Sequence, residues 1–456
     1  MLALSPIAHV QAAGKVSKKQ DVVIRKMESN KSAEPLKGWQ LVFRALGHRN
    51  YRLFFGGQGI SLIGTWMQQT AMSWLVYHRT NSAFLLGLVG FSGQIPALFL
   101  MPLAGVLTDR WNRHQILVIT QSLAMVQAFI LAFLDLTGAL NLPQILFLSF
   151  FLGLVNAFDM PTRQAFVVDL VARREDLGNA IALNSFIFNG ARLLGPSLGG
   201  FLISLLGEGV CFLLNGLSFL AVLAALLAMK IPAEKEKALG SPLRAQLKEG
   251  FTYALGFSPI RSILLFLSLI SLVGMGYVTL MPVFAKDILH GGPDTLGFLM
   301  AASGLGALMG AIFLASRKSV RGLGRIIALA SFIFGLGILI FSLSRIFLVS
   351  LLTLAFAGFG MMVQMASSNT ILQTIVDDDK RGRVMSLFTL AFMGMAPLGS
   401  LLAGSLAHWI GAPLTLLIAG VLCLGASFLF QWRLPRLRAM IRPIYLQKGI
   451  LNNMPE

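Results

Sequence analysis

Apolar residues form long runs along most of the chain, and charged residues, glycine and proline interrupt these runs. Most runs reach about 18 residues or more, the length that a helix needs to cross a hydrocarbon core of about 30 Å. The pattern predicts an all-α integral membrane protein with twelve membrane-spanning helices. The predicted spans cover residues 53–77, 83–107, 115–134, 142–162, 180–206, 209–230, 261–284, 295–316, 324–343, 346–375, 384–408 and 413–432.

A polar stretch at residues 231–260 divides the predicted spans into two sets of six. The two sets resemble each other, because Leu177–Gly200 and Arg381–Gly404 each begin at a charged turn and continue into a helix with a Gly/Pro kink. Two six-helix pseudo-repeats are typical of transporters, with a substrate site near the midplane. The predicted organisation is a disordered basic tail (1–51), a first half (52–230), a linker (231–260), a second half (261–433) and a second tail (434–456).

Composition supports the membrane assignment and excludes an ordinary soluble protein. Hydrophobic residues make up 56% of the chain and charged residues 12%, with a mean hydropathy of +0.75, whereas soluble domains carry about 25% charged residues. The net charge of +18 first suggests nucleic acid, but the basic residues lie in tails and short loops and do not form one folded face. We therefore expect anionic lipid headgroups as the counter-charge and no nucleic-acid partner.

The basic residues also predict how the chain crosses the membrane. Of the 37 lysines and arginines, all but Arg79, Lys286, Arg345 and Arg192 fall on one side of the predicted topology. Arg192 lies inside a span, and the other three lie on the opposite side. The positive-inside rule places both termini in the cytosol and the protein in the inner (plasma) membrane. The opening "MLALSPIAHVQAAG" lacks the basic start and long apolar core of a signal peptide, which favours a cytosolic tail.

The sequence gives no sign of a metal, cofactor or catalytic site. Cys211 and Cys423 each lie inside a hydrophobic run, as expected for small core residues, and the six histidines are scattered. No phosphate-binding G-x-x-x-x-G-K-[ST] loop and no G-x-S-x-G nucleophile motif is present. We predict that the protein is not an enzyme.

Two motifs resemble those of the major facilitator superfamily. "GVLTDRWNR" (Gly105–Arg113), between the second and third spans, matches the superfamily's G-x-x-x-D-R-x-x-R loop. "GPSLGG" in the fifth span resembles the G-P-x-x-G-G element of its antiporter branch; the matching residues are Gly195, Pro196, Gly199 and Gly200. Glycines allow close helix contact, and a proline removes one backbone donor. The resemblance covers about residues 52–433 and implies the major facilitator fold.

Three short sequence stretches indicate a subgroup within the superfamily. The stretches "EGFTYALGFSPIR", "TLMPVFAKDIL" and "LGFLMAASGLGALMGA" are similar to the subgroup that contains enterobactin-type siderophore exporters and macrolide efflux proteins. That resemblance implies export of an amphipathic small molecule, such as a drug or siderophore, against proton entry.

The superfamily resemblance also implies a gate on the cytosolic side. In the family the loop aspartate is held by an arginine at the end of span four and by the start of span eleven, which points here to Asp109, Arg163 and the helix near Val384. The gate motif comprises Gly105, Asp109, Arg110, Arg113 and Arg163. The alternative is that the loop charges only anchor the turn at the headgroups. The matching turn of the second half, "LASRKSVRGLGR", lacks the aspartate, so a symmetric second latch is not expected.

Two charged residues are predicted within spans, where charge is costly and functional by default. Arg192 could bind an anionic substrate, pair with an acid during transport, or tie helices together in a structural pair. Asp159 could be the carboxylate that couples transport to protons, or a loop-facing cap before Pro161. The early span-four arginine of many antiporters is absent, so proton coupling rests on the resemblance.

The fold that the resemblance implies has a central cavity lined by spans one, four, seven and ten. Polar and aromatic residues on these spans would suit a bulky amphipathic compound. The candidates are Gln58, Thr65, Gln68, Asn156, Tyr277, Gln364 and Ser368. The alternative is that they form hydrogen bonds between helices.

Taken together, these features predict a monomeric, proton-coupled secondary transporter that exports an amphipathic small molecule by alternating access and needs no cofactor. The rival hypotheses are an importer or facilitator on the same fold, a lipid flippase, and a membrane scaffold that does not transport.

Overall fold

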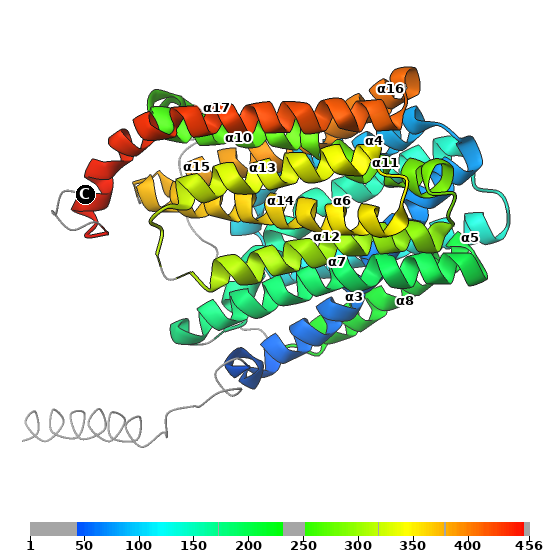
Figure 1. Ribbon diagram of the computed structural model, residues 1–456. Coiled ribbons are helices and arrows are strands. Elements are labelled where there is room, and N and C mark those ends of the chain that lie inside the picture. Colours follow the sequence, from blue (N-terminus) through cyan, green and yellow to red (C-terminus); the bar gives the residue numbers. More distant parts are fainter. Residues whose placement is uncertain (1–42, 172, 231–250, 318, 378–379, 451–456) are drawn as a thin grey trace, which may run out of the picture.

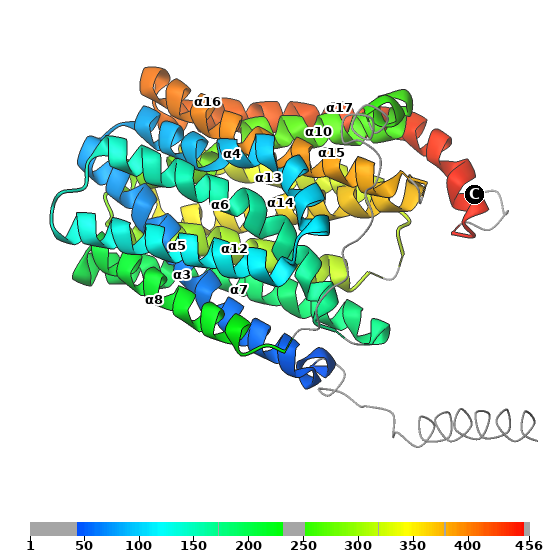
Figure 2. The same cartoon turned by 180° about the vertical axis from the view of Figure 1, so that it is seen from behind.

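The computed structural model describes residues 43–171, 173–230, 251–317, 319–377 and 380–450. Long helices run side by side through most of this part of the chain (Figures 1 and 2). The described chain begins and ends on the same side of the bundle, which we call the tail side, and the opposite side is the far side. Most of the predicted N-terminal tail and of the linker lies outside the described residues.

The first half of the bundle contains six long helices, α3 to α8, which correspond to the first six predicted spans. Two short 3-10 turns, η1 (Arg44–Gly47) and η2 (Arg174–Asp176), lie on the tail side. The long helices are α3 (Arg49–Thr80), α4 (Ala83–Arg110), α5 (Arg113–Leu136), α6 (Leu142–Asp169), α7 (Leu177–Leu206) and α8 (Glu208–Leu227).

The second half supplies the other six spans, two of them broken. The seventh span consists of α10 (Ser258–Gly274), α11 (Gly276–Val283) and the π-helical η3 (Phe284–Ile288), and the eleventh of α15 (Arg381–Met393) and α16 (Met395–Ile410). The others are α12 (Pro293–Ala315), α13 (Leu323–Leu343), α14 (Phe347–Ile375) and α17 (Ala412–Gln447).

The sequence explains both helix breaks. Pro397 follows the break between α15 and α16, and its ring would clash with the carbonyl of Met393 in a continuous helix. The break between α10 and α11 falls between Gly274 and Gly276, and glycine weakens a helix interior. A Cβ atom at Gly276 would lie 2.4 Å from the Cβ of Ala403 in α16, so this glycine also lets the two broken spans pack closely.

The predicted twelve-span, all-α membrane architecture is confirmed. Within the described residues, eleven segments are long and apolar enough to cross a membrane, and α3 packs beside them as the twelfth. The α3 helix is less apolar because it carries several glutamines and its first turns are polar. The last span runs past its predicted end, because Leu434 and Leu437 are buried against the second half and hold the helix through Pro435.

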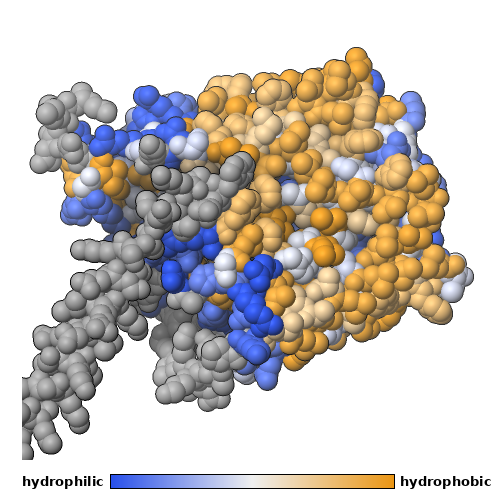
Figure 3. Space-filling model, turned by 90° about the horizontal axis from the view of Figure 1, so that it is seen from below, coloured by the Kyte–Doolittle hydropathy of each residue, from blue (hydrophilic) through white to orange (hydrophobic). Residues whose placement is uncertain are grey.

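The outer surface is apolar across the middle of the bundle, as a membrane requires. Figure 3 shows hydrophobic residues over most of one face, with hydrophilic residues gathered towards the tail side. Large apolar side chains on this exterior include Phe99, Phe133 and Leu227, each about two-thirds or more exposed in the isolated chain. Lipid tails would cover these side chains.

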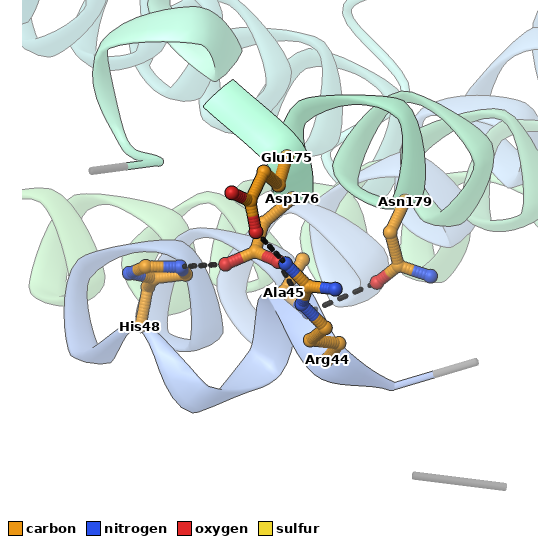
Figure 4. A network of polar contacts seen from close by, with 6 residues as sticks. All are labelled: Arg44, Ala45, His48, Glu175, Asp176 and Asn179. Carbon is orange, nitrogen blue, oxygen red and sulfur yellow. Dashed lines mark hydrogen bonds and ion pairs between the residues drawn. The ribbon is translucent and has the colours of Figure 1, made fainter. Parts of the chain in front are cut away.

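Polar contacts on the tail side connect the start of α3 to the start of α7; we call them the N-terminal clamp (Figure 4). Asp176 is buried and pairs with Arg44 and with His48, whose Nε2 lies 2.9 Å from its carboxylate. Arg44 also pairs with Glu175 at 3.0 Å, and the first turn of η1 donates a backbone N–H to Asn179. Burial raises the pKa of Asp176, but the His48 hydrogen bond and the Arg44 charge outweigh it, so the pKa lies below its usual value.

Candidate functional site

The two halves meet on the far side along α7 and α12, where glycines bring the backbones into contact. A Cβ atom at Gly200 would lie 2.4 Å from the carbonyl oxygen of Pro293, and one at Gly297 would lie 2.5 Å from that of Pro196. Such distances exclude any larger residue without a backbone shift. We call this contact the α7–α12 seam.

The "GPSLGG" motif contributes the residues through which α7 packs against two helices, α12 and α3, near the far side. Gly200 and Pro196 face α12, as just described, whereas Gly195 and Gly199 face α3. A Cβ atom at Gly195 would lie 2.4 Å from the Cβ of Trp66, and one at Gly199 would lie 3.2 Å from the Cα of Met67. The motif therefore packs α7 against its own half and against the other half at the same depth.

A second seam joins α4 to α16, also on the far side. A Cβ atom at Gly87 would lie 2.6 Å from the carbonyl oxygen of Ser400, and one at Gly404 would lie 2.6 Å from that of Ala83. Because two helices from each half take part, the far side is closed by two separate backbone contacts.

Side chains reinforce the closure at the far-side rim, in a cluster that we call the far-side latch. Tyr77 of α3 donates a hydrogen bond to Asp287 of η3, and Lys286 Nζ donates to Asn81 Oδ1 at 2.6 Å. The Lys286 ammonium also lies 5.7 Å from the centre of the Tyr77 ring. Tyr77, Asn81, Asp287 and His408 line a pocket of about 310 Å³.

The halves separate towards the tail side. Ala182, Ser185, Pro196 and Gly200 recur at helical spacing on one face of α7. Pro196 and Gly200 are buried at the seam, but Ala182 and Ser185 are exposed. The face that is sealed at the far side is thus open to solvent nearer the tail side. The structure is closed on the far side and open on the tail side.

Arg192 lies on α7 at the depth where the seam ends. Its guanidinium carbon is 5.9 Å from the centre of the Trp66 ring, and Trp66 makes an edge contact with Phe188 at 6.0 Å. A Cβ atom at Gly304 of α12 would lie 2.7 Å from the Arg192 carbonyl oxygen. Arg192 therefore lies where α3 and α7 of the first half meet α12 of the second.

Asp159 lies inside the first half and does not cap a helix. The α6 helix continues through Pro161 to its end at Asp169, so the predicted alternative of a loop-facing cap is wrong. Asp159 is 3% exposed and accepts hydrogen bonds from Thr120 Oγ1 at 2.9 Å and Gln121 Nε2 at 2.7 Å. Its other oxygen pairs with Arg163 at 3.0 Å. A single side chain thus connects α5 and α6.

The predicted gate motif spans the turn between α4 and α5. The α4 helix ends at Arg110, and Arg113 begins α5 and pairs with Asp169 at the end of α6 at 2.8 Å. The side chains of Asp109 and Arg110 lie outside the described residues, as does the packing of Gly105. Arg163 contacts Asp159, so its predicted contact with Asp109 stays a prediction. The predicted helix near Val384 begins slightly earlier, at the start of α15.

Several polar residues predicted for the cavity are buried within one half. Gln68 Nε2 donates to Gln127 Oε1 at 3.1 Å, and Gln68 Oε1 accepts a hydrogen bond from Asn215 Nδ2 at 2.7 Å. These bonds connect α3, α5 and α8. For Gln68 the structure supports the alternative of hydrogen bonding between helices.

The same holds for the second half. Tyr277 is fully buried and shares a hydrogen bond with Ser303 at 2.8 Å, and Ser368 donates to the Gln364 carbonyl within α14. The Gln364 side chain is also fully buried, with no hydrogen-bond partner for its amide among the described residues. In this conformation none of these side chains is open to solvent.

The remaining predicted cavity residues differ in exposure. Thr65 and Asn156 are partly exposed, and Thr65 donates to the Ser61 carbonyl of its own helix. Gln58 is 3% exposed. Thr65 and Asn156 are the members of the predicted set that solvent reaches, and their contact with a substrate stays a prediction.

Comparison with known proteins identifies the family. The family model described as transmembrane secretion effector matches residues 42–445. The chain belongs to this family of the major facilitator superfamily. The resemblance inferred from the two sequence motifs is thereby confirmed. The match extends over nearly all of the helices that the structure describes in this chain.

The alignments with curated relatives cover most of this chain and nearly all of each relative. The chain is 27% identical to the staphyloferrin A transporter of Staphylococcus aureus over 387 residues, which span 83% of this chain and 95% of that protein. It is 25% identical to the multidrug efflux pump Tap of Mycolicibacterium fortuitum (84% and 93% covered) and 22% identical to macrolide efflux protein A of Streptococcus pyogenes (85% and 95% covered).

Solved structures with the same fold include a bacterial homologue of the human lysosomal transporter Spinster in an inward-facing, unoccupied conformation. The TM-score is 0.63 at 15% identity, with 87% of this chain and 98% of that chain covered. The nucleoside transporter NupG gives a TM-score of 0.66 at 16% identity, with 86% and 98% covered. At such low identity these structures establish the fold alone.

Gln69 of α3 is exposed but was not among the cavity residues predicted from the sequence. Gly57 and Gly64 of α3 contact α8, and Gln68 lies on that same face, so the next residue points elsewhere. Gln69 is exposed although α3 packs against helices of both halves. The sequence placed two glutamines side by side, and only the position of α8 decides which of them is buried.

Proposed function

We propose that this protein is a secondary active transporter that exports amphipathic small molecules across the plasma membrane by alternating access, as a monomer. Its curated relatives carry names of a siderophore transporter and of drug efflux pumps. The basic residues near the ends of the spans favour a cytosolic tail side. In that orientation the conformation described above is open to the cytosol and closed outside.

The observation that carries the proposal is the change along the inter-half face of α7. The residues of this face pack against α12 at the far side and are exposed towards the tail side. A helix that packs through glycine without interlocking side chains can roll against its neighbour. Closing the tail side and opening the far side would carry a bound molecule from the cytosol to the outside.

Proton entry is the coupling step in this proposal, and Asp159 is the candidate carboxylate. It is buried, and Thr120, Gln121 and Arg163 satisfy its oxygens. Protonation would weaken its pairing with Arg163 and release the arginine. Because Arg163 is partly exposed, that release would change the charge at the surface that faces the open side.

Asp109 is proposed as the tail-side gate, held by Arg163 and the start of α15 when the tail side closes. In the present conformation Arg163 pairs with Asp159. The two carboxylates would then compete for one arginine, which connects proton binding to gate closure. A carboxylate at a helix N-terminus beside an arginine is favourable by about 1–3 kcal/mol, enough to bias a gate without locking it.

Everted membrane vesicles energised by respiration test the proposal. We expect vesicles that contain the protein to accumulate at least one of three fluorescent amphiphiles: cationic ethidium, anionic N-dansyl-phenylalanine or its neutral methyl ester. A protonophore should abolish the accumulation. If none of the three accumulates above vesicles without the protein, export is rejected. Accumulation that survives the protonophore would reject proton coupling.

The gate is tested by Asp109→Asn in the same vesicles. We expect normal expression and a roughly tenfold loss of export, because the gate loses its charge. Glu175→Gln is the matched control, since it removes an 80% exposed carboxylate from the same side of the protein. Equal export by wild type and Asp109→Asn would reject the gate.

A further inference from the structure

Arg192 points away from the lipid. The exposed apolar stripe of α7 contains Leu194, Leu198 and Phe201, which are 50%, 45% and 58% exposed. On a helix with 3.6 residues per turn, Arg192 lies on the opposite side from this stripe, near the residues that face α12. The guanidinium is therefore placed between the halves, and a lipid headgroup is not its natural partner.

Arg192 is also open from the tail side. Arg192 is partly exposed. Ser185, which lies on the same face of α7 and two turns closer to the tail side, is exposed. One turn farther towards the far side from Trp66, Thr70 of α3 donates a hydrogen bond to Met300 Sδ of α12 at 3.5 Å. Arg192 thus lies on the tail side of the closed contact between the two halves and next to it. A substrate site of an alternating-access transporter is expected at such a position between the halves.

No carboxylate of the described residues pairs with this arginine. Asp159, the buried acid within α6, forms an ion pair with Arg163, and Asp135 at the far side forms one with Arg79. The contact that Arg192 does make is with the face of Trp66. An aromatic ring offsets only part of the cost of a membrane-embedded charge, because it carries no net charge.

We propose that Arg192 binds the carboxylate of an anionic organic substrate, and that Trp66 and Phe188 hold the apolar part of the same molecule. This inference rests on the proposed transport function and specifies its substrate class. A guanidinium matches a carboxylate through two parallel hydrogen bonds. The edge contact between Trp66 and Phe188 places an apolar surface beside that charge. The site therefore selects molecules that carry an anionic group next to an aromatic or aliphatic body.

Binding to the purified protein in lipid nanodiscs tests the assignment, with N-dansyl-phenylalanine as the anionic probe and its methyl ester as the neutral probe. We expect the wild type to bind the acid at least tenfold more tightly than the ester. Arg192→Gln should reduce this preference to less than twofold by weakening binding of the acid, with ester binding unchanged. Arg345→Gln is the control, because it removes an exposed arginine at the far side and should keep the preference.

Arg192→Lys keeps the charge and protects the test against misfolding of the glutamine variant. We expect it to weaken binding of the acid three- to tenfold, since lysine cannot form the paired hydrogen bonds. A wild type without preference for the acid overturns the proposal, and so does an arginine variant that retains the full preference. Accumulation of any of the three probes in everted vesicles reports on the transport function separately. A protein that exports at least one probe but binds the acid without preference would overturn the substrate assignment alone, so the two failures are distinguishable.

Discussion

The far side and the tail side of this protein are held together in opposite ways. At the far side the contacts cross between the halves: two glycine seams bring backbones together, and the far-side latch adds Tyr77–Asp287 and Lys286–Asn81. On the tail side the strong polar contacts that we describe stay within one half. Examples are the N-terminal clamp in the first half and, in the second, the hydrogen bond from Tyr253, in the segment that leads into α10, to Asp377, just after α14.

This difference separates the contacts that must break during transport from those that must persist. A rocking motion of two rigid halves breaks contacts between halves and leaves contacts within each half intact. Glycine seams suit the first task, since close apolar contact releases without leaving charges unpaired. Buried ion pairs suit the second, because separating them is costly. Substitutions on the two sides should therefore affect different measurements.

The largest effect is expected from Gly200→Ala in the α7–α12 seam. The added methyl group would meet the Pro293 carbonyl oxygen at 2.4 Å, and such overpacking costs roughly 1–3 kcal/mol of far-side closure. We expect export in everted vesicles to fall roughly tenfold or more, because the closed state becomes less populated.

Gly190→Ala on the same helix is the matched control for the seam. A Cβ atom there meets nothing within 4 Å, so export should stay within twofold of wild type. Equal losses in both variants would mean that helix flexibility, rather than the fit between the halves, explains the result at Gly200.

A smaller effect is expected from Tyr77→Phe, which removes the hydrogen bond from α3 to Asp287 across the latch. At the rim of the bundle a hydrogen bond contributes about 0.5–1.5 kcal/mol net, so the far-side-open population should rise roughly two- to tenfold. Spin labels at Thr137 and Arg345, exposed positions at the far side in different halves, would report the change as a larger share of long distances.

Tyr253→Phe makes the same chemical change within one half. It removes the hydroxyl that donates to Asp377 at 3.1 Å on the tail side, and it should leave the far-side distance distribution as in wild type. A shift of equal size in both variants would contradict the distinction between contacts that cross the halves and contacts that do not.

The smallest effect on transport is expected from Asp176→Asn in the N-terminal clamp. We expect export within twofold of wild type, because the clamp lies inside the first half. Thermal unfolding should still reveal a loss of about 1–2 kcal/mol at pH 7, since the variant leaves Arg44 and His48 without their carboxylate.

The pH dependence of that loss has a definite sign. The pKa of Asp176 is lowered in the folded protein, so its charge stabilises the fold above the usual aspartate pKa of about 3.9 and ceases to do so as the pH falls through the lowered value. The gap in unfolding temperature between wild type and variant should therefore shrink towards about pH 3. A gap that is constant from pH 7 to pH 3 would rule out this electrostatic role, and Glu175→Gln should show little gap at any pH.

Much of the fold could be predicted from local features of the sequence. Span lengths follow from the runs of apolar residues, and the break in the eleventh span follows from Pro397. The uneven distribution of basic residues predicts the side on which each loop lies, and the glycines of "GPSLGG" indicate the close helix contact that the structure contains. Each of these properties depends on a residue and its immediate neighbours along the chain.

The sequence alone did not determine which polar side chain faces which neighbour. In a membrane protein both the lipid-facing and the interior faces of a helix are apolar, so hydrophobic periodicity cannot distinguish them. Gln68 and Gln69 are adjacent and chemically identical, yet the position of α8 buries the first and leaves the second exposed.

The same limit applies to the charged residues. The sequence identified Asp159 and Arg192 as charges inside spans, but the tertiary structure decided that Asp159 connects α5 to α6 and that Arg192 lies between the halves without a carboxylate partner among the described residues. The physical reason is that the number and length of helices are set by transfer of single segments into lipid, whereas the partners of a polar group are set by the packing of several segments at once.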